Sequence, residues 1–103
     1  MIRSRLELIF TQDEMHRLFI YESSDSILKI VADVHGMKCV QAKRFINNII
    51  NIVRSSFRLV IVHGFNHGTA IKDMLAETFK NAHIIERHLD THNSGVTHML
   101  IAA

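Results

Sequence analysis

Two short apolar runs that enclose an amphipathic segment constrain the fold of this chain more than any other feature. Residues 28–34 (LKIVADV) and 58–63 (RLVIVH) are nearly continuous apolar runs, as expected of strands buried within a sheet. Between them, the segment from Cys39 to Arg54 has apolar residues at the i, i+3, i+4 and i+7 spacing of a helix with one buried face. A strand, a helix and a second strand form a crossover unit, so we expect 28–34 and 58–63 to lie parallel in one sheet.

The second half of the chain adds another helix and two more strands. An amphipathic helix is predicted from Thr69 to Lys80, with Thr69 as its N-cap. Strands are predicted at 83–89 and 96–102, and the polar turn DTHNSG between them is typical of a hairpin. This order of strands and helices indicates an α/β protein.

The first 27 residues fit two interpretations. RLELIF (residues 5–10) looks like a strand, and residues 17–21 favour another because aromatic and branched side chains are dense there. The competing interpretation is a helix that begins at Thr11, because Thr11 and Glu14 have the spacing of a capping box. We prefer the strand at 17–21.

Length and composition limit the class of protein. The chain has 103 residues, enough for one domain with a modest core, and its apolar runs are too short to cross a bilayer. The N-terminal sequence MIRSRLELIF has no long apolar core or cleavage site, so we expect a cytoplasmic protein with no membrane partner. A single cysteine excludes an internal disulfide and a cysteine-rich zinc site. The net charge of +2 is not by itself a nucleic-acid signature.

Each of the two predicted parallel strands runs into a His-Gly pair, His35-Gly36 after the first and His63-Gly64 after the second. Because parallel strands end at the same edge of a sheet, we expect both corners at the carboxyl edge, where open α/β sheets bind ligands. The glycines allow the backbone to turn sharply and a ligand to approach closely. The sequence therefore predicts a site shared by the two corners.

The first corner has a pattern suited to acid–base chemistry. Asp33 and His35 alternate along one strand, so their side chains are expected on the same face. A carboxylate beside an imidazole fixes its tautomer and stabilises its protonated form, which suits proton transfer near neutral pH. The alternative interpretation is that Asp33 only caps the turn into the first helix.

The second corner has a pattern suited to binding phosphate. The turn HGFNHGT leads into a predicted helix, whose first N–H groups and dipole favour an anion. Lys38, Lys72 and Arg87 are candidates for further positive charge at this edge, although each alone is also typical of a solvated surface. The predicted phosphate-binding residues are Gly36, Lys38, Gly64, Asn66, His67, Gly68, Thr69, Lys72 and Arg87.

A metal site is the alternative for the same residues. The side chains of Asp33, His35, His63 and His67 are suitable ligands for zinc or manganese, but their spacing matches no compact zinc signature. We therefore rank direct acid–base use of Asp33, His35 and His63 above it. The sequence requires no cofactor and is compatible with a divalent metal.

Three stretches of the sequence resemble one known family. ADVHGMKCVQAKRFI resembles the LDLHG opening of the Smr (small MutS-related) domain and the helix that follows it, and VIVHGFNHGTAIKDML resembles that family's HGxG motif. NSGVTHMLI is similar to its closing glycine–threonine strand, and the three pieces occur in the family's order over about residues 28–102. Two differences are that Ala32 replaces the usual leucine, and that Gly68 follows Gly64 by four positions instead of two.

The resemblance implies a two-layer α/β sandwich, similar to the C-terminal domain of translation initiation factor three, with a mixed sheet. It divides the chain into an Smr-like domain at 28–103 and an N-terminal extension, 1–27, packed on it. It also implies binding of DNA or RNA and, as in several members, endonuclease activity. Asp33 and His35 match the acid and the histidine of the first motif, and His63 and Gly64 match the start of the second.

Together these patterns predict a nucleic-acid-binding protein that hydrolyses phosphodiester bonds. Asp33 orients His35 as the general acid or base, while His63 and the amides of residues 64–69 hold the phosphate. The alternative is a module that docks on DNA, structured RNA or a ribosome without cutting it. The sequence does not predict an oligomeric state.

Overall fold

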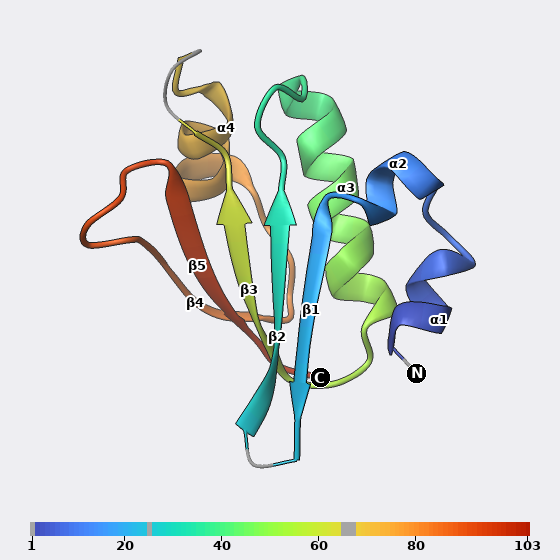
Figure 1. Ribbon diagram of the computed structural model, residues 1–103. Coiled ribbons are helices and arrows are strands. Elements are labelled where there is room, and N and C mark those ends of the chain that lie inside the picture. The colour runs from blue at the N-terminus through green and yellow to red at the C-terminus, as the bar shows by residue number, and fades with distance from the viewer. Residues whose placement is uncertain (1, 25, 65–67) are drawn as a thin grey trace.

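A computed structural model describes residues 2–24, 26–64 and 68–103 of the chain (Figure 1). Its centre is a five-stranded mixed sheet in the order β1-β2-β3-β5-β4. The strands are β1 (Leu18–Ser23), β2 (Ser26–Asp33), β3 (Phe57–Val62), β4 (Ile84–Leu89) and β5 (Val96–Ile101). The helices are α1 (Ile2–Glu7), α2 (Gln12–Met15), α3 (Cys39–Ile52) and α4 (Ala70–Asp73), and α4 continues into a π-helix, η1 (Met74–Thr78).

The predicted crossover unit is confirmed. β2 and β3 are parallel neighbours, in register from the pair Leu28 and Phe57 to the pair Asp33 and Val62. The amphipathic helix between them, α3, ends at Ile52, slightly before the predicted end at Arg54. Its apolar face is buried against the sheet, which gives the two-layer α/β sandwich that was predicted.

The C-terminal hairpin is also confirmed, and its position in the sheet matters for the site. β4 and β5 are antiparallel, and β5 lies between β4 and β3. β5 is antiparallel to β3, so Val96, at the start of β5, is the register partner of Val62, at the end of β3. The turn that precedes β5 therefore lies beside the second His-Gly corner.

The first 27 residues belong to the same structural unit. The predicted strand at 5–10 is wrong: residues 2–7 form α1, because Leu6 and Phe10 are buried at a helical spacing while Leu8 and Ile9 are exposed. The capping box at Thr11 and the strand that follows it both form, one after the other, as α2 and β1. This segment supplies an edge strand of the sheet and four core residues, Leu6, Phe10, Met15 and Leu18.

The second predicted helix, 69–80, is not a regular α-helix. Only Ala70–Asp73 is α-helical, and the following residues form a wider π-helical turn in which the N–H of Phe79 donates to the carbonyl of Met74. The Thr69 side chain makes no capping hydrogen bond to the helix backbone; its hydroxyl donates to Asp73 Oδ2 at 2.8 Å. The segment still buries the apolar residues that its periodicity predicted, Ile71, Met74, Leu75 and Phe79.

The core lies between the sheet and one layer of helices. Alternate residues of β2, β3 and β5 face α3, α4 and η1 and are buried, among them Ile30, Leu59 and Met99. Figure 1 shows α3 and α4 on the same side of the sheet. In the described part of the chain, every helix is too short or too polar to cross a membrane.

Candidate functional site

The two His-Gly corners lie side by side at the carboxyl edge of β2 and β3, as predicted. The N–H of Val34 donates to the carbonyl of Val62 at 2.8 Å, so the chains remain paired up to the corners. Gly36 and Gly64 both have a left-handed backbone, with φ of +80° and +73°. A Cβ atom added to Gly64 would lie 3.6 Å from His35 Cβ, which shows how closely the two turns approach.

The Asp33 and His35 side chains form a hydrogen-bonded pair. The distance from Asp33 Oδ1 to His35 Nδ1 is 2.5 Å, and the same oxygen accepts the backbone N–H of His35 at 3.1 Å. The carboxylate therefore both caps the turn and holds the ring, so the two interpretations of Asp33 are compatible. The His35 side chain is 63% exposed and that of Asp33 is 30% exposed. With Nδ1 donating to the carboxylate, Nε2 is the nitrogen left to exchange a proton with a ligand.

Arg17 fixes the first corner from the N-terminal segment. Its Nη1 donates to the carbonyls of Asp33 and His35, both at 3.1 Å, and its own carbonyl accepts the N–H of Asp33 at 2.9 Å. Arg17 therefore positions the turn that carries the His35 ring and adds a positive charge next to it. We did not predict this role, because no motif or periodic pattern distinguishes Arg17 in the sequence.

His63 has a different environment. Its side chain is buried, its Nδ1 lies 3.0 Å from the carbonyl of Gly64, and its Nε2 lies 2.8 Å from Thr97 Oγ1. Because a carbonyl only accepts, Nδ1 carries the proton and Nε2 accepts the Thr97 hydroxyl. Burial is the main cause that lowers the pKa of His63; the charge of Lys72 lowers it further, while the bond to Gly64 opposes the shift. The ring is therefore neutral at pH 7 and held by two internal hydrogen bonds.

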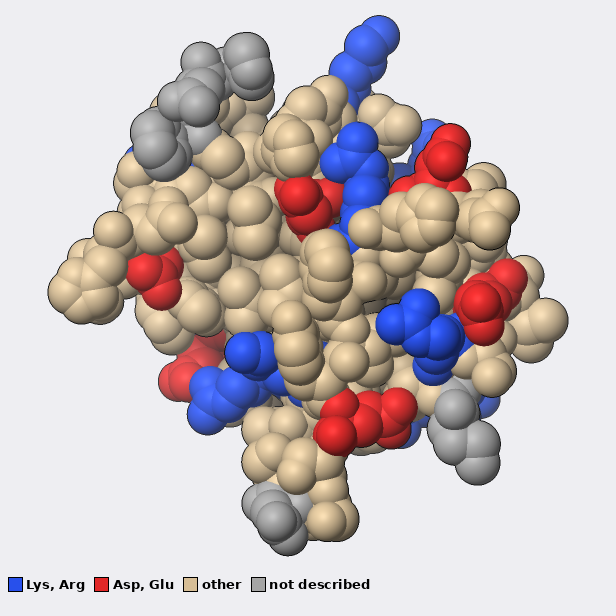
Figure 2. Space-filling view, in the orientation of Figure 1, with Lys and Arg blue, Asp and Glu red and all other residues tan. Residues whose placement is uncertain are grey.

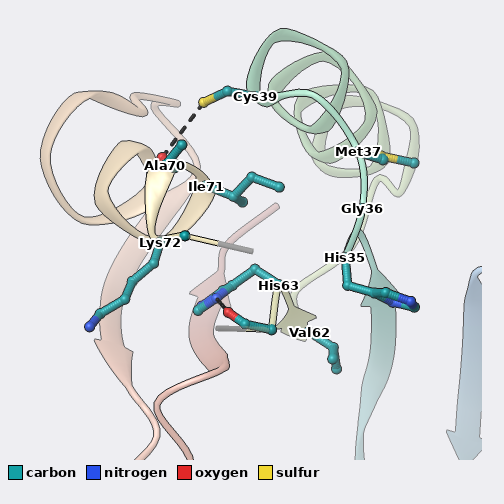
Figure 3. Close-up of a pocket in the computed structure, with 11 residues that line it drawn as sticks. His35, Gly36, Met37, Cys39, Val62, His63, Ala70, Ile71 and Lys72 are labelled. Atoms are coloured by element: carbon teal, nitrogen blue, oxygen red, sulfur yellow. Dashed lines mark hydrogen bonds between the residues drawn. The ribbon is translucent and has the colours of Figure 1, made fainter. Parts of the chain in front are cut away.

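The two imidazoles do not converge, although their backbones do. Along β2, residues 33 and 35 alternate with the buried Ala32 and Val34, whereas His63 continues the buried positions of β3. Figure 3 shows the two rings extending in opposite directions from the adjacent corners. The structure thus brings His35 together with Asp33, and brings His63 together with Thr97.

The turn before β5 completes the second corner. The carbonyl of Gly95 accepts the N–H groups of His63 and Gly64, at 2.9 and 3.0 Å. Gly95 and Thr97 therefore join the closing glycine–threonine stretch directly to His63 and Gly64. Neither residue was among the predicted site residues, although the stretch GVT had been recognised in the sequence as part of the resemblance.

A cavity of about 560 Å³ lies next to the corners. It is lined by both turns and by the starts of α3 and α4, and Lys72 and Cys39 lie on its wall (Figure 3). The Sγ atom of Cys39 lies 3.7 Å from the carbonyl of Ala70, so the two helix starts are in contact. α3 has 14 residues, and its first N–H groups have no partners within the helix, so this wall of the cavity favours an anion.

The predicted phosphate-binding residues differ in where the structure places them. Gly36, Gly64, Gly68 and Lys72 line the cavity, and Lys38 is exposed at the N-cap of α3. The hydroxyl of Thr69 is occupied by Asp73. Arg87 does not line the cavity: its guanidinium points to the helix layer and donates to the carbonyls of Leu75 and Phe79, each at 2.6 Å. Asn66 and His67 lie outside the described residues.

The described residues contain no group of three or more histidine, cysteine, aspartate or glutamate side chains arranged to hold a metal ion. One of the four ligands considered for such a site, His67, is outside that part of the chain. No protein-family model matches the chain, and no curated protein is significantly similar to it. The relation to the Smr family therefore stays a prediction from the three motif stretches.

Proposed function

We propose that this chain is an Smr-like nucleic-acid-binding protein that cleaves phosphodiester bonds at the first His-Gly corner. The observation that carries the proposal is the Asp33–His35 pair, hydrogen-bonded at 2.5 Å and exposed beside a cavity with Lys72 on its wall. A histidine whose tautomer is fixed by a carboxylate is the usual arrangement for a general base or acid.

The two residues have distinct roles in this mechanism. Nε2 of His35 takes the proton from the attacking oxygen, which is water or, in RNA, the neighbouring 2′-hydroxyl. The resulting imidazolium is stabilised by the Asp33 carboxylate on Nδ1, and it returns the proton to the leaving oxygen. Arg17 keeps the turn in place through the carbonyls of Asp33 and His35.

The phosphate is held by the neighbouring cavity. The ammonium of Lys72 and the first N–H groups of α3 supply positive potential there, and Gly36 and Gly64 leave room for the backbone of a nucleic acid. Lys38, exposed at the N-cap of α3, adds positive charge at the start of this helix. We assign His63 to support of the second corner, because both its ring nitrogens are engaged within the protein.

A non-catalytic binding module for nucleic acid or the ribosome is the second candidate. It is favoured by the internal position of His63, which leaves His35 as the one exposed imidazole among the described residues of the two corners. In this case the same cavity binds phosphate and no bond is broken.

The two candidates are separated by incubating purified protein with labelled single- and double-stranded DNA and RNA, with and without chelator. Cleavage supports the first, and loss of cleavage by a factor of about 100 to 10,000 in His35→Ala, with binding retained, assigns it to this residue. His92→Ala is the matched control, because His92 is an exposed histidine on the β4–β5 turn. Binding without cleavage on all substrates and metals supports the second candidate.

The chelator arm identifies the chemistry. Cleavage of RNA that survives chelator and leaves a cyclic phosphate indicates attack by the 2′-hydroxyl without a metal. Sensitivity to chelator instead favours a metal held by residues such as Asp33 and His35.

A further inference from the structure

The face of the sheet opposite α3 and α4 is not covered by any helix in the described part of the chain. The strand register places its side chains in rows that cross all five strands. One row consists of Phe19, Val31, Val60, His98 and His88, and the next consists of Tyr21, Lys29, Arg58, Leu100 and Glu86. We call these two rows the open face. Figure 2 shows an uncharged central area on this side of the molecule, with positive and negative side chains above and below it.

Rings occupy both edges of the open face. On the edge strand β1, Phe19 is 47% exposed and Tyr21 is 54% exposed. On the opposite side, the rings of His88 and His98 are stacked with centroids 5.2 Å apart and an angle of 19° between their planes. Half-buried valines of β2 and β3 lie between them. The open face therefore has planar rings at both of its edges and apolar valine side chains between them.

The open face also carries positive charge next to these rings. Lys29 and Arg58 are register partners on β2 and β3, so two like charges stand side by side and repel one another. Neither forms a salt bridge within the described residues. The Nζ atom of Lys29 lies 5.0 Å from the centroid of the Tyr21 ring. An anion that also presents ring faces would therefore complement this surface in both charge and shape.

The open face leads to the proposed active site. Lys29, Val31 and Asp33 are alternate residues of β2, so the Asp33–His35 pair stands at the carboxyl end of the same face. The acidic groups near this end are engaged: Asp33 with His35, and Asp90 with His98 at 2.6 Å. A chain laid on the open face is thus directed towards His35.

We propose that the open face binds a single strand of nucleic acid, with its bases stacked on the exposed rings and its phosphates near Lys29 and Arg58. This inference rests on the proposed function and specifies its substrate as single-stranded DNA or RNA. In a duplex each base is already stacked on its neighbours, whereas an unpaired base can stack on an aromatic side chain, and sheet surfaces with exposed aromatics bind two or three bases this way.

Tyr21 provides a direct test, because the chain has one tyrosine and no tryptophan. Tyrosine emission therefore reports on the open face itself. We would titrate the full chain, as His35→Ala to prevent cleavage, with oligo(dT) and oligo(U) of about ten nucleotides, and with a duplex of equal length. We expect single strands to quench the emission and the duplex to quench it much less.

Substitutions then locate the binding energy, measured by fluorescence anisotropy of a labelled oligonucleotide. Phe19→Ala should weaken binding about tenfold, because one stacked base is lost, while Phe19→Tyr should retain it. Lys29→Gln and Arg58→Gln should each reduce the slope of log K against log salt by about 0.7. Leu8→Ala and Lys43→Gln are the matched controls, since both residues are exposed away from the open face, after α1 and on α3.

The outcomes separate this inference from the proposed function. If single strands bind without changing Tyr21 emission, and Phe19→Ala binds as tightly as the unsubstituted chain, the inference is wrong while nucleic-acid binding stands. If neither single strands nor duplexes bind, the proposed function fails as well. If Tyr21 emission changes with protein concentration alone, the open face is the interface to a second copy of the chain, and that overturns the inference too.

Discussion

The two His-Gly corners share a dipeptide and a left-handed glycine, yet their histidines have opposite environments. His35 is exposed and paired with a carboxylate, whereas His63 is buried and bonded to a hydroxyl and a carbonyl. The cause is the phase of each strand: His35 continues the open side of β2, and His63 continues the buried side of β3. One position along a strand therefore decides whether such a histidine is exposed at the edge of the sheet or buried and bonded within the protein.

The strongest test of this difference between the two corners is to remove the negative charge of Asp33, the partner of His35. In Asp33→Asn the amide oxygen can still accept the N–H of His35, but it cannot stabilise an imidazolium. We expect the cleavage rate to fall by at least about 100-fold, measured in single-turnover assays. Glu77→Gln, an exposed carboxylate on η1, is the control. An unchanged rate in Asp33→Asn would exclude acid–base catalysis by this pair.

Substitution of the histidine at the second corner, His63, should change the stability of the fold rather than a reaction rate. His63→Ala removes both internal hydrogen bonds and leaves Thr97 Oγ1 without its ring partner in a buried position. We expect the free energy of unfolding to fall by about 2 kcal/mol, measured by denaturant titration. In contrast, His35→Ala should change it by less than about 0.5 kcal/mol, because the His35 side chain is exposed.

A double-mutant cycle would assign the loss to the contact itself. Thr97→Val keeps the volume of the side chain and removes the hydroxyl. If the His63–Thr97 bond matters as proposed, the two substitutions together should cost less than the sum of their separate effects, by roughly 1 kcal/mol. Strictly additive effects would show that the bond contributes little to stability.

The sequence was sufficient to predict most of the fold. Periodicity identified α3, the two parallel strands and the hairpin, because each buries one regular set of apolar side chains. It misread residues 5–10, where Leu6 and Phe10 have helical spacing but the surrounding LELIF also fits a short strand. It also gave no sign of the π-helical turn, where Arg87 of β4 donates to two carbonyls, because that contact is not local in sequence.

The site was predictable in its location and less so in its orientation. The two corners follow neighbouring parallel strands and must therefore lie at the same edge of the sheet, and the order of strands and helices in the sequence was enough to predict this. The direction of the His63 ring depended on which side of β3 is buried. In FRLVIV the single charged residue, Arg58, is the sign of this: it puts 58, 60 and 62 on the open side and His63 on the buried side, a signal that the otherwise apolar run did not bring out. Arg17 and Gly95 act through backbone contacts, for which residue type alone carries no signal.

The pH dependence of stability sharpens the contrast between the corners. The pKa of His63 is lowered from its ordinary value of 6.5, so the unfolded chain binds this proton more readily than the folded one. The free energy of unfolding therefore decreases as pH falls below about 6.5 towards the folded pKa of His63. This one group contributes a slope of at most about 1.4 kcal/mol per pH unit. His63→Gln should remove that contribution; equal pH slopes in both proteins between pH 7 and 5 would contradict the assignment.

Substitution of Lys72 is predicted to have the smallest effects, one on nucleic-acid binding and one on the pKa of His63. It lines the cavity proposed for phosphate, and its charge also helps to lower the pKa of His63. Lys72→Ala should reduce the slope of log K against log salt by about 0.7 to 0.9, as should Lys38→Ala, while Lys43→Ala on the outer side of α3 should leave it unchanged. Lys72→Ala should also raise the pKa of His63, so that the loss of stability on acidification becomes smaller, whereas Lys38→Ala should not. If Lys43→Ala reduced this salt slope and Lys72→Ala did not, the phosphate would not bind at the two corners. The cavity would then contribute no more to binding than any other basic part of the surface.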